Sequence, residues 1–422
     1  MGFRFMEKVF LLWGILFGAP GLCIDVADQS MAISNILIFA VIVYQAIIQI
    51  KNSIMYFYGE YVLWYVCLCS IAVTSLISFV TLPDTWFFVS LSRTLKIVVV
   101  LSAFIFLYPR NELIILKKNF IRGLYYSAII NMLWAWVQMY CGYIQGFNVN
   151  RVLFREMLHL SSNVNWDQSV AHDIVYRMSG LSWEPATLGF IVCIGYIVTN
   201  NKLLKVLFII TMLLSTSKSG IICLTLLIIR DVWWCISIEK ITTMVRVQIR
   251  SIVILSLCII VTGGIFIEYN DYIMKAKDEV IFIIDLISSS LFSPQDNFSS
   301  NIHSMYYFEL FNVLNKEEFF NVLFGVGMFA AGYPYEMNRL VIFSGAWIPE
   351  SDFITIIVGS GIIGGILYYL ILIRNVLYTK LYKDVSLNFF LFVYGFFYGT
   401  GLSCFIVLFL LSLREKDFES YE

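Results

Sequence analysis

Apolar stretches long enough to cross a lipid bilayer recur along almost the whole chain, and they constrain its fold more than any other feature. They fall at about 9–22, 34–50, 61–80, 86–108, 123–143, 185–199, 203–214, 220–234, 252–267, 353–373 and 387–413. A backbone in hydrocarbon must satisfy its own hydrogen bonds, and these stretches lack the alternation of strands, so we expect helices. With 60% hydrophobic residues, the chain is too apolar for an ordinary soluble domain.

The sequence therefore predicts an all-α, polytopic integral membrane protein of about 11 transmembrane helices. The last stretch contains Gly395 and Gly401 and is either one tilted helix or two short ones, which would give about 12 helices. No linker or internal repeat divides the sequence, so we expect residues 1–422 to form a single membrane domain.

Lysine and arginine residues predict the orientation, because positive charges are retained on the cytoplasmic side. If the N-terminus is inside, basic residues gather in the cytoplasmic segments 4–8, 51, 110–122, 202–205, 230–250 and 374–383. Two long connections, 144–183 and 268–352, then face the outside and are the expected place of external function. The net charge of -1 excludes only a strongly basic nucleic-acid-binding protein.

The segment before the stretch at 185–199 places charges at the membrane edge. It reads Arg177-Met-Ser-Gly-Leu-Ser-Trp-Glu184-Pro185. Pro185 suits the first turn of a helix, whose start presents backbone N–H groups and the positive end of the helix dipole. Together with Arg177, these groups suit an anionic ligand, above all a phosphate. The alternative is an ion pair between Arg177 and Glu184 that closes the loop.

A second candidate is the hydroxyl-rich turn Leu214-Ser-Thr-Ser-Lys-Ser-Gly220. Lys218 violates the charge rule in this outer turn, and a turn rich in serine and glycine at a helix start favours anion binding. Alternatively, Ser215 or Ser217 caps the helix and Lys218 is solvated.

Arg93 and Lys96 lie inside the stretch at 86–108, three residues apart and therefore on one helix face. They either line a cavity and hold a lipid headgroup or pyrophosphate, or extend their side chains to the outer surface. The sequence leaves both readings open.

A further helix start follows the larger loop, at Glu350-Ser-Asp352. One of its carboxylates accepts a proton from a sugar hydroxyl, or both only complement the helix dipole. Among the histidines, His303 is the best candidate for chemistry, with a structural role as the alternative. The sequence lacks His-x-x-x-His and Asp-x-Asp spacing, so we expect no bound metal.

In these motifs the chain resembles the bacterial O-antigen polymerase (Wzy) family, to which the O-antigen ligases are related. The matching pieces, in chain order, are Arg177-x-Ser-Gly-Leu-x-x-Glu-Pro185, Leu214-Ser-Thr-Ser-Lys-Ser-Gly220, Leu323-Phe-Gly-Val-Gly327, Glu350-Ser-Asp352 and Gly361-Ile-Ile-Gly364. The family commonly has an arginine where this chain has Lys218, and another where it has His303.

The resemblance implies a metal-independent membrane glycosyltransferase of the GT-C type, without a cofactor, in the bacterial inner membrane. Such an enzyme joins undecaprenyl-pyrophosphate-linked oligosaccharide repeat units into polysaccharide at the periplasmic face. Donor and acceptor are both carried on the membrane lipid, and a polysaccharide chain-length regulator is a further implied partner.

The resemblance also implies roles for the candidate residues. Pyrophosphate binding falls to Arg177, assisted by Lys218 and by Arg93 or Lys96. The candidates for general base are Glu184, His303 and Glu350. Aromatic residues placed to stack on sugar rings, or to anchor the protein at the interface, are Trp183, Tyr306, Tyr307 and Trp347.

Two other functions compete with this prediction. An O-antigen ligase transfers the finished glycan to lipid A-core instead of extending it. A secondary transporter also has many apolar helices, but it is expected to show paired halves and ionisable groups near the middle of the bilayer. Here the candidate residues collect toward the outer face.

Overall fold

The computed structural model describes the chain in segments, with the largest gap between residues 238 and 306. The described residues are 3–26, 29–143, 145–160, 170–171, 175–176, 178–182, 184–215, 217–238, 306–307, 309–338, 351–379, 382–399 and 402–413. The stretch predicted to span the membrane at 252–267 lies outside them.

Helices make up most of the described structure. In chain order they are α1 (Phe3–Phe17), α2 (Ile33–Asn52), the 3₁₀ turn η1 (Gly59–Tyr61), α3 (Val62–Thr81), α4 (Asp84–Leu107), α5 (Arg110–Tyr143), the π-helical turn η2 (Arg151–Met157), α6 (Pro185–Val198), α7 (Lys202–Ser215), α8 (Lys218–Ile238), α12 (Leu310–Lys316), α13 (Phe319–Phe324), α14 (Tyr333–Met337), α15 (Asp352–Gly359), α16 (Gly361–Tyr378), α17 (Tyr382–Phe397) and α18 (Leu402–Ser412). Two small antiparallel hairpins complete it, β1 (Cys23–Val26) with β2 (Gln29–Ala32) and β3 (Val170–Ala171) with β4 (Val175–Tyr176).

The predicted all-α membrane character is confirmed. Among the described residues, four segments are long and apolar enough to cross a bilayer: α2, η1 with α3, α4, and α16. The total of about 11 spans and the GT-C fold stay predictions.

Three predicted stretches differ from the helices that form. α5 starts at Arg110, well before the apolar stretch, because lysine and arginine lower hydropathy without breaking a helix. The stretch at 353–373, expected as one helix, is divided into α15 and α16 at Ser360. The last stretch forms two helices, α17 and α18, which decides between the two alternatives left open by the sequence.

Four glycines explain the break between α15 and α16. We call Gly325, Gly327, Gly359 and Gly361 the glycine contact. Gly325 and Gly361 have φ of 84° and 71°, a left-handed conformation that favours glycine. A Cβ on Gly325 would overlap the carbonyl of Gly359, so the two backbones touch directly. The N–H of Gly327 donates to the Gly359 carbonyl at 2.9 Å. The motif at 323–327 thus docks the outer loop onto the α15–α16 junction.

Close backbone approach also joins α1 to α5. A Cβ on Gly14 would lie 2.9 Å from Gly123 Cα, and a Cβ on Gly123 would lie 2.8 Å from Gly14 Cα. Small residues at such a crossing allow the tight van der Waals packing that holds membrane helices together.

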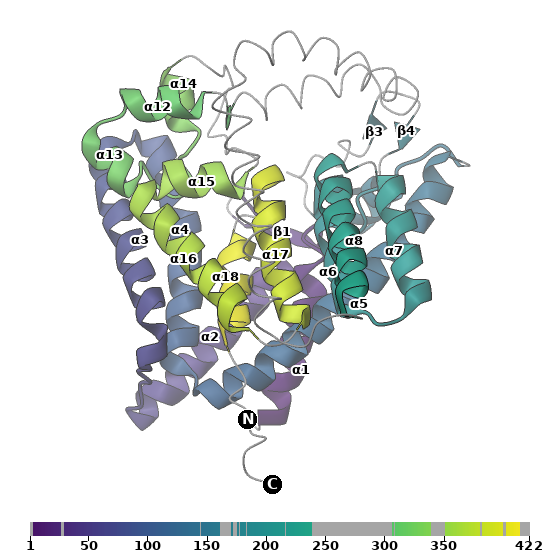
Figure 1. Ribbon diagram of the computed structural model, residues 1–422, viewed down its shortest axis with the longest axis horizontal. Helices are drawn as coiled ribbons and strands as arrows, with labels where there is room; N and C mark the ends of the chain where they lie inside the picture. The colour runs from purple at the N-terminus through teal and green to yellow at the C-terminus, as the bar shows by residue number, and fades with distance from the viewer. Residues whose placement is uncertain are drawn as a thin grey trace.

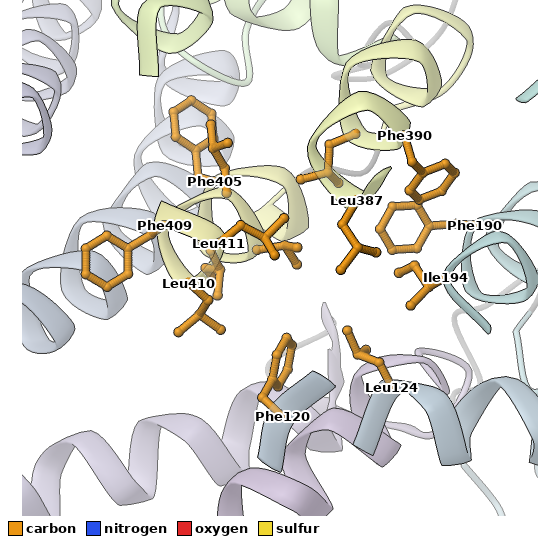
Figure 2. Packing of buried hydrophobic residues seen from close by; sticks show 14 of the residues in the cluster. Phe120, Leu124, Phe190, Ile194, Leu387, Phe390, Phe405, Phe409, Leu410 and Leu411 are labelled. Carbon is orange, nitrogen blue, oxygen red and sulfur yellow. The ribbon is translucent and has the colours of Figure 1, made fainter. Parts of the chain in front are cut away.

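Apolar side chains of α5, α6, α17 and α18 fill the centre of the bundle (Figure 2). The labelled members are Phe120, Leu124, Phe190, Ile194, Leu387, Phe390, Phe405, Phe409, Leu410 and Leu411. Because α6 and α17 both contribute, this packing fixes their relative position, on which the candidate site below depends.

The bundle has two chemically different ends. In Figure 1, α12, α13, α14 and the hairpin β3–β4 lie at the end opposite the start of α1. At the α1 end, two lysines form ion pairs with carboxylates: Lys117 Nζ lies 2.7 Å from Asp384, and Lys205 Nζ lies 3.2 Å from Asp231. We call these the loop end and the basic end. The loop assignment from sequence and the membrane side that each end faces stay predictions.

Candidate functional site

Buried side-chain amides hold the segment 178–182, which precedes α6. Gln138 of α5 accepts hydrogen bonds from the N–H groups of Ser179 and Gly180 at 3.2 and 2.8 Å. Asn131, two turns earlier on the same helix face, accepts from the N–H of Leu181 at 2.7 Å. These amides replace the partners that the backbone would otherwise find in water.

A third amide, from Asn150, completes the set. Its Nδ2 donates to the carbonyls of Gly180 and Ser182 at 2.9 and 3.1 Å, and its Oδ1 accepts from Trp134 at 2.7 Å. Gly180 has a φ of 64°, and a Cβ there would press on Asn131, so this position requires glycine. We call Asn131, Gln138 and Asn150 the amide clamp.

The amide clamp holds the middle of the 177–185 motif, from Ser179 to Ser182. Arg177 and Trp183, both predicted site residues, lie outside the described residues. Glu184 is described: it has extended backbone, with φ −119° and ψ 134°, and directly precedes Pro185, the first residue of α6. The predicted helix start at Pro185 is confirmed.

Glu184 contacts the junction between α17 and α18. Its carboxylate accepts a hydrogen bond from the Tyr398 hydroxyl, which also lies 3.4 Å from the Thr187 hydroxyl. One turn earlier, the Tyr394 hydroxyl donates to the carbonyl of Ala186. Tyr394 of α17 and Tyr398, the residue just after its end, therefore fix the first turn of α6.

The start of α8 lies against the same region. Ser217 accepts from the N–H of Gly220 at 3.2 Å and so caps this helix, as the second reading of the turn expected. A Cβ on Gly220 would lie 3.1 Å from the Cα of Gly189, which shows how closely α8 approaches α6. α8 also packs against α17, the helix that carries Tyr394. Lys218 is the first residue of α8, and its side chain is outside the described part.

The start of α15 reaches the same junction from the other side. Ser351 caps this helix, accepting from the N–H of Ile354 at 3.3 Å, and donates to the Gly395 carbonyl at 3.3 Å. The N–H of Asp352 donates to the carbonyl of Tyr398 at 3.4 Å. Asp352 itself is buried, and Glu350 lies outside the described residues.

Three helix starts, those of α6, α8 and α15, thus meet around Tyr394 and Tyr398, and we call this arrangement the helix-start cluster. Figure 1 shows it toward the loop end, where α15 runs across the bundle to the top of α17. Each helix start carries a partial positive charge from its unpaired N–H groups. Helix starts that lie together favour a negatively charged group between them. The carboxylates of Glu184 and Asp352 already lie in part of this positive electrostatic field.

Arg93 and Lys96 lie elsewhere in the described structure. Both are half-buried on α4, and neither forms an ion pair with a described carboxylate. The Arg93 guanidinium lies 5.8 Å from the ring centre of Phe329, in the loop that follows the glycine contact. The structure therefore pairs Arg93 with the outer loop, and phosphate binding by these two residues stays a prediction.

Tyr306 and Tyr307 connect the outer loop to the bundle. Tyr306 is 2% exposed, and its ring packs edge-on against Tyr335 at 4.7 Å. The Tyr307 hydroxyl lies 2.6 Å from the Ser351 hydroxyl and donates to the Phe396 carbonyl. Burial raises the pKa of Tyr307 well above its usual range, so this hydroxyl stays protonated. Both tyrosines thus have docking contacts, and their stacking on sugar rings stays a prediction.

His303 and Trp347 lie outside the described residues. Within the described part of the chain, no three His, Cys, Asp or Glu side chains come together as metal ligands would. Metal independence remains an expectation from the sequence.

Sequence reasoning missed the amide clamp and the two tyrosines of the helix-start cluster. A signal for the clamp was present, because Asn131 and Gln138 are polar residues seven apart in an apolar stretch, and polar groups buried in membranes need partners. Tyr394 and Tyr398 gave a weaker signal as an i, i+4 pair between apolar residues.

Comparisons with known proteins identify no relative. No protein-family model, curated protein or solved structure matches this chain. The functional argument therefore depends on the residues themselves.

Proposed function

We propose that this protein is an O-antigen polymerase of the Wzy type. In the proposed reaction, undecaprenyl-pyrophosphate-linked repeat units are joined into polysaccharide at the periplasmic face of the bacterial inner membrane. The observation that carries the proposal is the helix-start cluster, which gathers three positive helix ends beside the 177–185 motif at the loop end.

The chemistry of the reaction fits this environment. The hydroxyl oxygen of an acceptor sugar attacks the anomeric carbon of the donor glycan, and a general base takes the hydroxyl proton. The bond from that carbon to the pyrophosphate oxygen breaks, and its electron pair leaves on undecaprenyl pyrophosphate. Negative charge therefore grows on the leaving group, and groups that stabilise it lower the barrier.

The candidate residues take the following roles. Arg177, next to the clamped segment, binds the pyrophosphate, and Lys218 at the start of α8 assists it. Arg93 or Lys96 contributes from α4. Glu184, Glu350 or His303 serves as the base, with two lipid anchors supplying proximity.

Glu184 has one supporting contact for such a role. Its hydrogen bond from Tyr398 orients the carboxylate at the start of α6.

The experiment is complementation of a strain that lacks this gene, with lipopolysaccharide separated by chain length. Arg177→Ala is expected to abolish long chains while membrane insertion is normal, and Arg177→Lys tests bidentate geometry against charge. The matched control is Arg155→Ala, an exposed arginine of the same predicted outer loop. Unaltered chain length in Arg177→Ala would remove Arg177 from the mechanism.

The same strain separates the competing functions. Loss of a polymerase leaves single repeat units on the lipid A-core, whereas loss of a ligase leaves none. A transporter predicts repeat units that accumulate on the wrong side of the membrane. The ligase and the transporter are therefore distinct outcomes of one deletion.

A further inference from the structure

A small cavity at the basic end is independent of the helix-start cluster. It is open at one side and lies where the start of α5 and the η1–α3 junction meet the ends of α16 and α18. Its polar lining comes from Glu60, Tyr61, Arg110, Arg374, Asn375 and Ser412.

Among the described residues that line this cavity, arginines outnumber carboxylates. Arg110 forms an ion pair with the Glu60 carboxylate. Arg374 donates to the backbone carbonyl of Glu60 at 3.1 Å, and it has no ion pair with any carboxylate in the described part of the chain. Among the described residues, two guanidinium groups of the lining therefore share its one carboxylate, that of Glu60.

Tyr61 gives a second, independent indication of a ligand. Its side chain is 3% exposed and lines the cavity, and its hydroxyl is buried without a hydrogen-bond partner among the described residues. Buried polar groups in native proteins are nearly always paired, so an unpaired hydroxyl on a residue that lines a cavity points to a partner bound there. A group with acceptor oxygens would satisfy it.

The surroundings place the cavity at the level of lipid headgroups. Tyr58 and Trp64 lie beside it: the Tyr58 hydroxyl accepts from the N–H of Arg110 at 3.2 Å, and Trp64 donates to Ser412 at 3.1 Å. Tyrosine and tryptophan concentrate where the bilayer meets water. From here α3 runs into the membrane with exposed apolar side chains, among them Val62 and Val66.

We propose that this cavity binds the phosphate group of an anionic phospholipid in the leaflet at the basic end. Arg374 and Arg110 supply the charge, and the Tyr61 hydroxyl donates a hydrogen bond to a phosphate oxygen. The acyl chains lie along the exposed apolar face of α3. A free phosphate ion offers the same oxygens, but it makes no use of that face.

The test uses the purified, delipidated full-length protein and follows its melting temperature in detergent. The probes are phosphatidylglycerol, phosphatidylcholine and inorganic phosphate, each titrated separately. The variants are Arg374→Gln and the matched control Arg122→Gln, which removes an arginine on α5 that contacts Tyr126 outside the cavity.

Phosphatidylglycerol is expected to raise the melting temperature of the wild type and of Arg122→Gln with saturation. Arg374→Gln is expected to weaken the apparent affinity about tenfold, because one charge-assisted contact to phosphate is lost. Equal responses of the two variants would overturn the proposal. An equal response to phosphatidylcholine would overturn it as well, and saturation by inorganic phosphate alone would overturn the lipid as the source.

Tyr61→Phe tests the proposal through the melting temperature measured without lipid and with lipid. Without lipid, this variant is expected to melt at a higher temperature than the wild type, because it removes an unpaired buried hydroxyl. With phosphatidylglycerol, its increase in melting temperature is expected to be smaller. A lower melting temperature without lipid would show that Tyr61 already has a partner and would contradict the proposed role.

Discussion

Asn150→Asp is the sharpest test of the amide clamp, because it changes one atom and keeps the shape of the side chain. Asn150 is 1% exposed, and its Nδ2 donates to the carbonyls of Gly180 and Ser182 at 2.9 and 3.1 Å. Aspartate places an acceptor oxygen against these two acceptors. The two lost hydrogen bonds contribute about 1 kcal/mol each, and the unsatisfied buried groups add about 1–3 kcal/mol. We expect a total loss of about 3–5 kcal/mol of folding free energy.

Asn148→Asp is the matched control. The Asn148 side chain uses its oxygen to accept from the N–H groups of Asn150 and Arg151 at 3.1 and 3.2 Å. Aspartate accepts the same bonds, so the expected change is within about 0.5 kcal/mol. Purified variants are compared by thermal unfolding in detergent with a thiol-reactive dye. If Asn150→Asp and Asn148→Asp unfold at the same temperature, the clamp does not hold the segment as described.

Three further predictions concern the glycine contact and the helix-start cluster. Gly325→Ala is expected to lower the free energy of unfolding by about 2–4 kcal/mol, because Gly325 has a positive φ and a Cβ there would overlap the Gly359 carbonyl. The control is Gly59→Ala, whose added Cβ would meet no atom within 4 Å, and it is expected to unfold like the wild type. Tyr398→Phe removes the hydrogen bond to the Glu184 carboxylate and is expected to shorten polysaccharide chains at normal protein abundance; full-length chains would exclude this contact from function. Lys218→Arg is expected to preserve chain length and Lys218→Ala to reduce it, since charge is the shared property; equal chain lengths in both variants would contradict a role for the cation.

Several features of the fold followed from sequence because they depend on local chemistry. Hydropathy located apolar helices such as α2, α3 and α4, and Pro185 marked the start of α6. For α8 the sequence offered Ser215 or Ser217 as the cap, and the structure has Ser217. Hydropathy could not locate the break at Ser360, because a divided apolar run has the same composition as a continuous one. The break depends on the glycine contact with Gly325, a residue that is distant in sequence.

The candidate site was less predictable, because its contacts join distant parts of the chain. The motif at 323–327 was one of the pieces that carry the family resemblance, and its described contacts are backbone packing. The bond from Tyr398 to Glu184 connects residues separated by 214 positions, and neither residue type alone signals the other. Long-range pairs of this kind come from helix packing, which single-sequence patterns do not encode.

The most direct test of the proposed function is a reconstitution with purified protein. Full-length protein in liposomes is given undecaprenyl-pyrophosphate-linked repeat units extracted from the deletion strain. We predict lipid-linked products of two or more repeat units together with released undecaprenyl pyrophosphate, and loss of both with Arg177→Ala. Wild-type protein that leaves single repeat units unchanged, or that moves them across the membrane without joining them, would contradict the proposal.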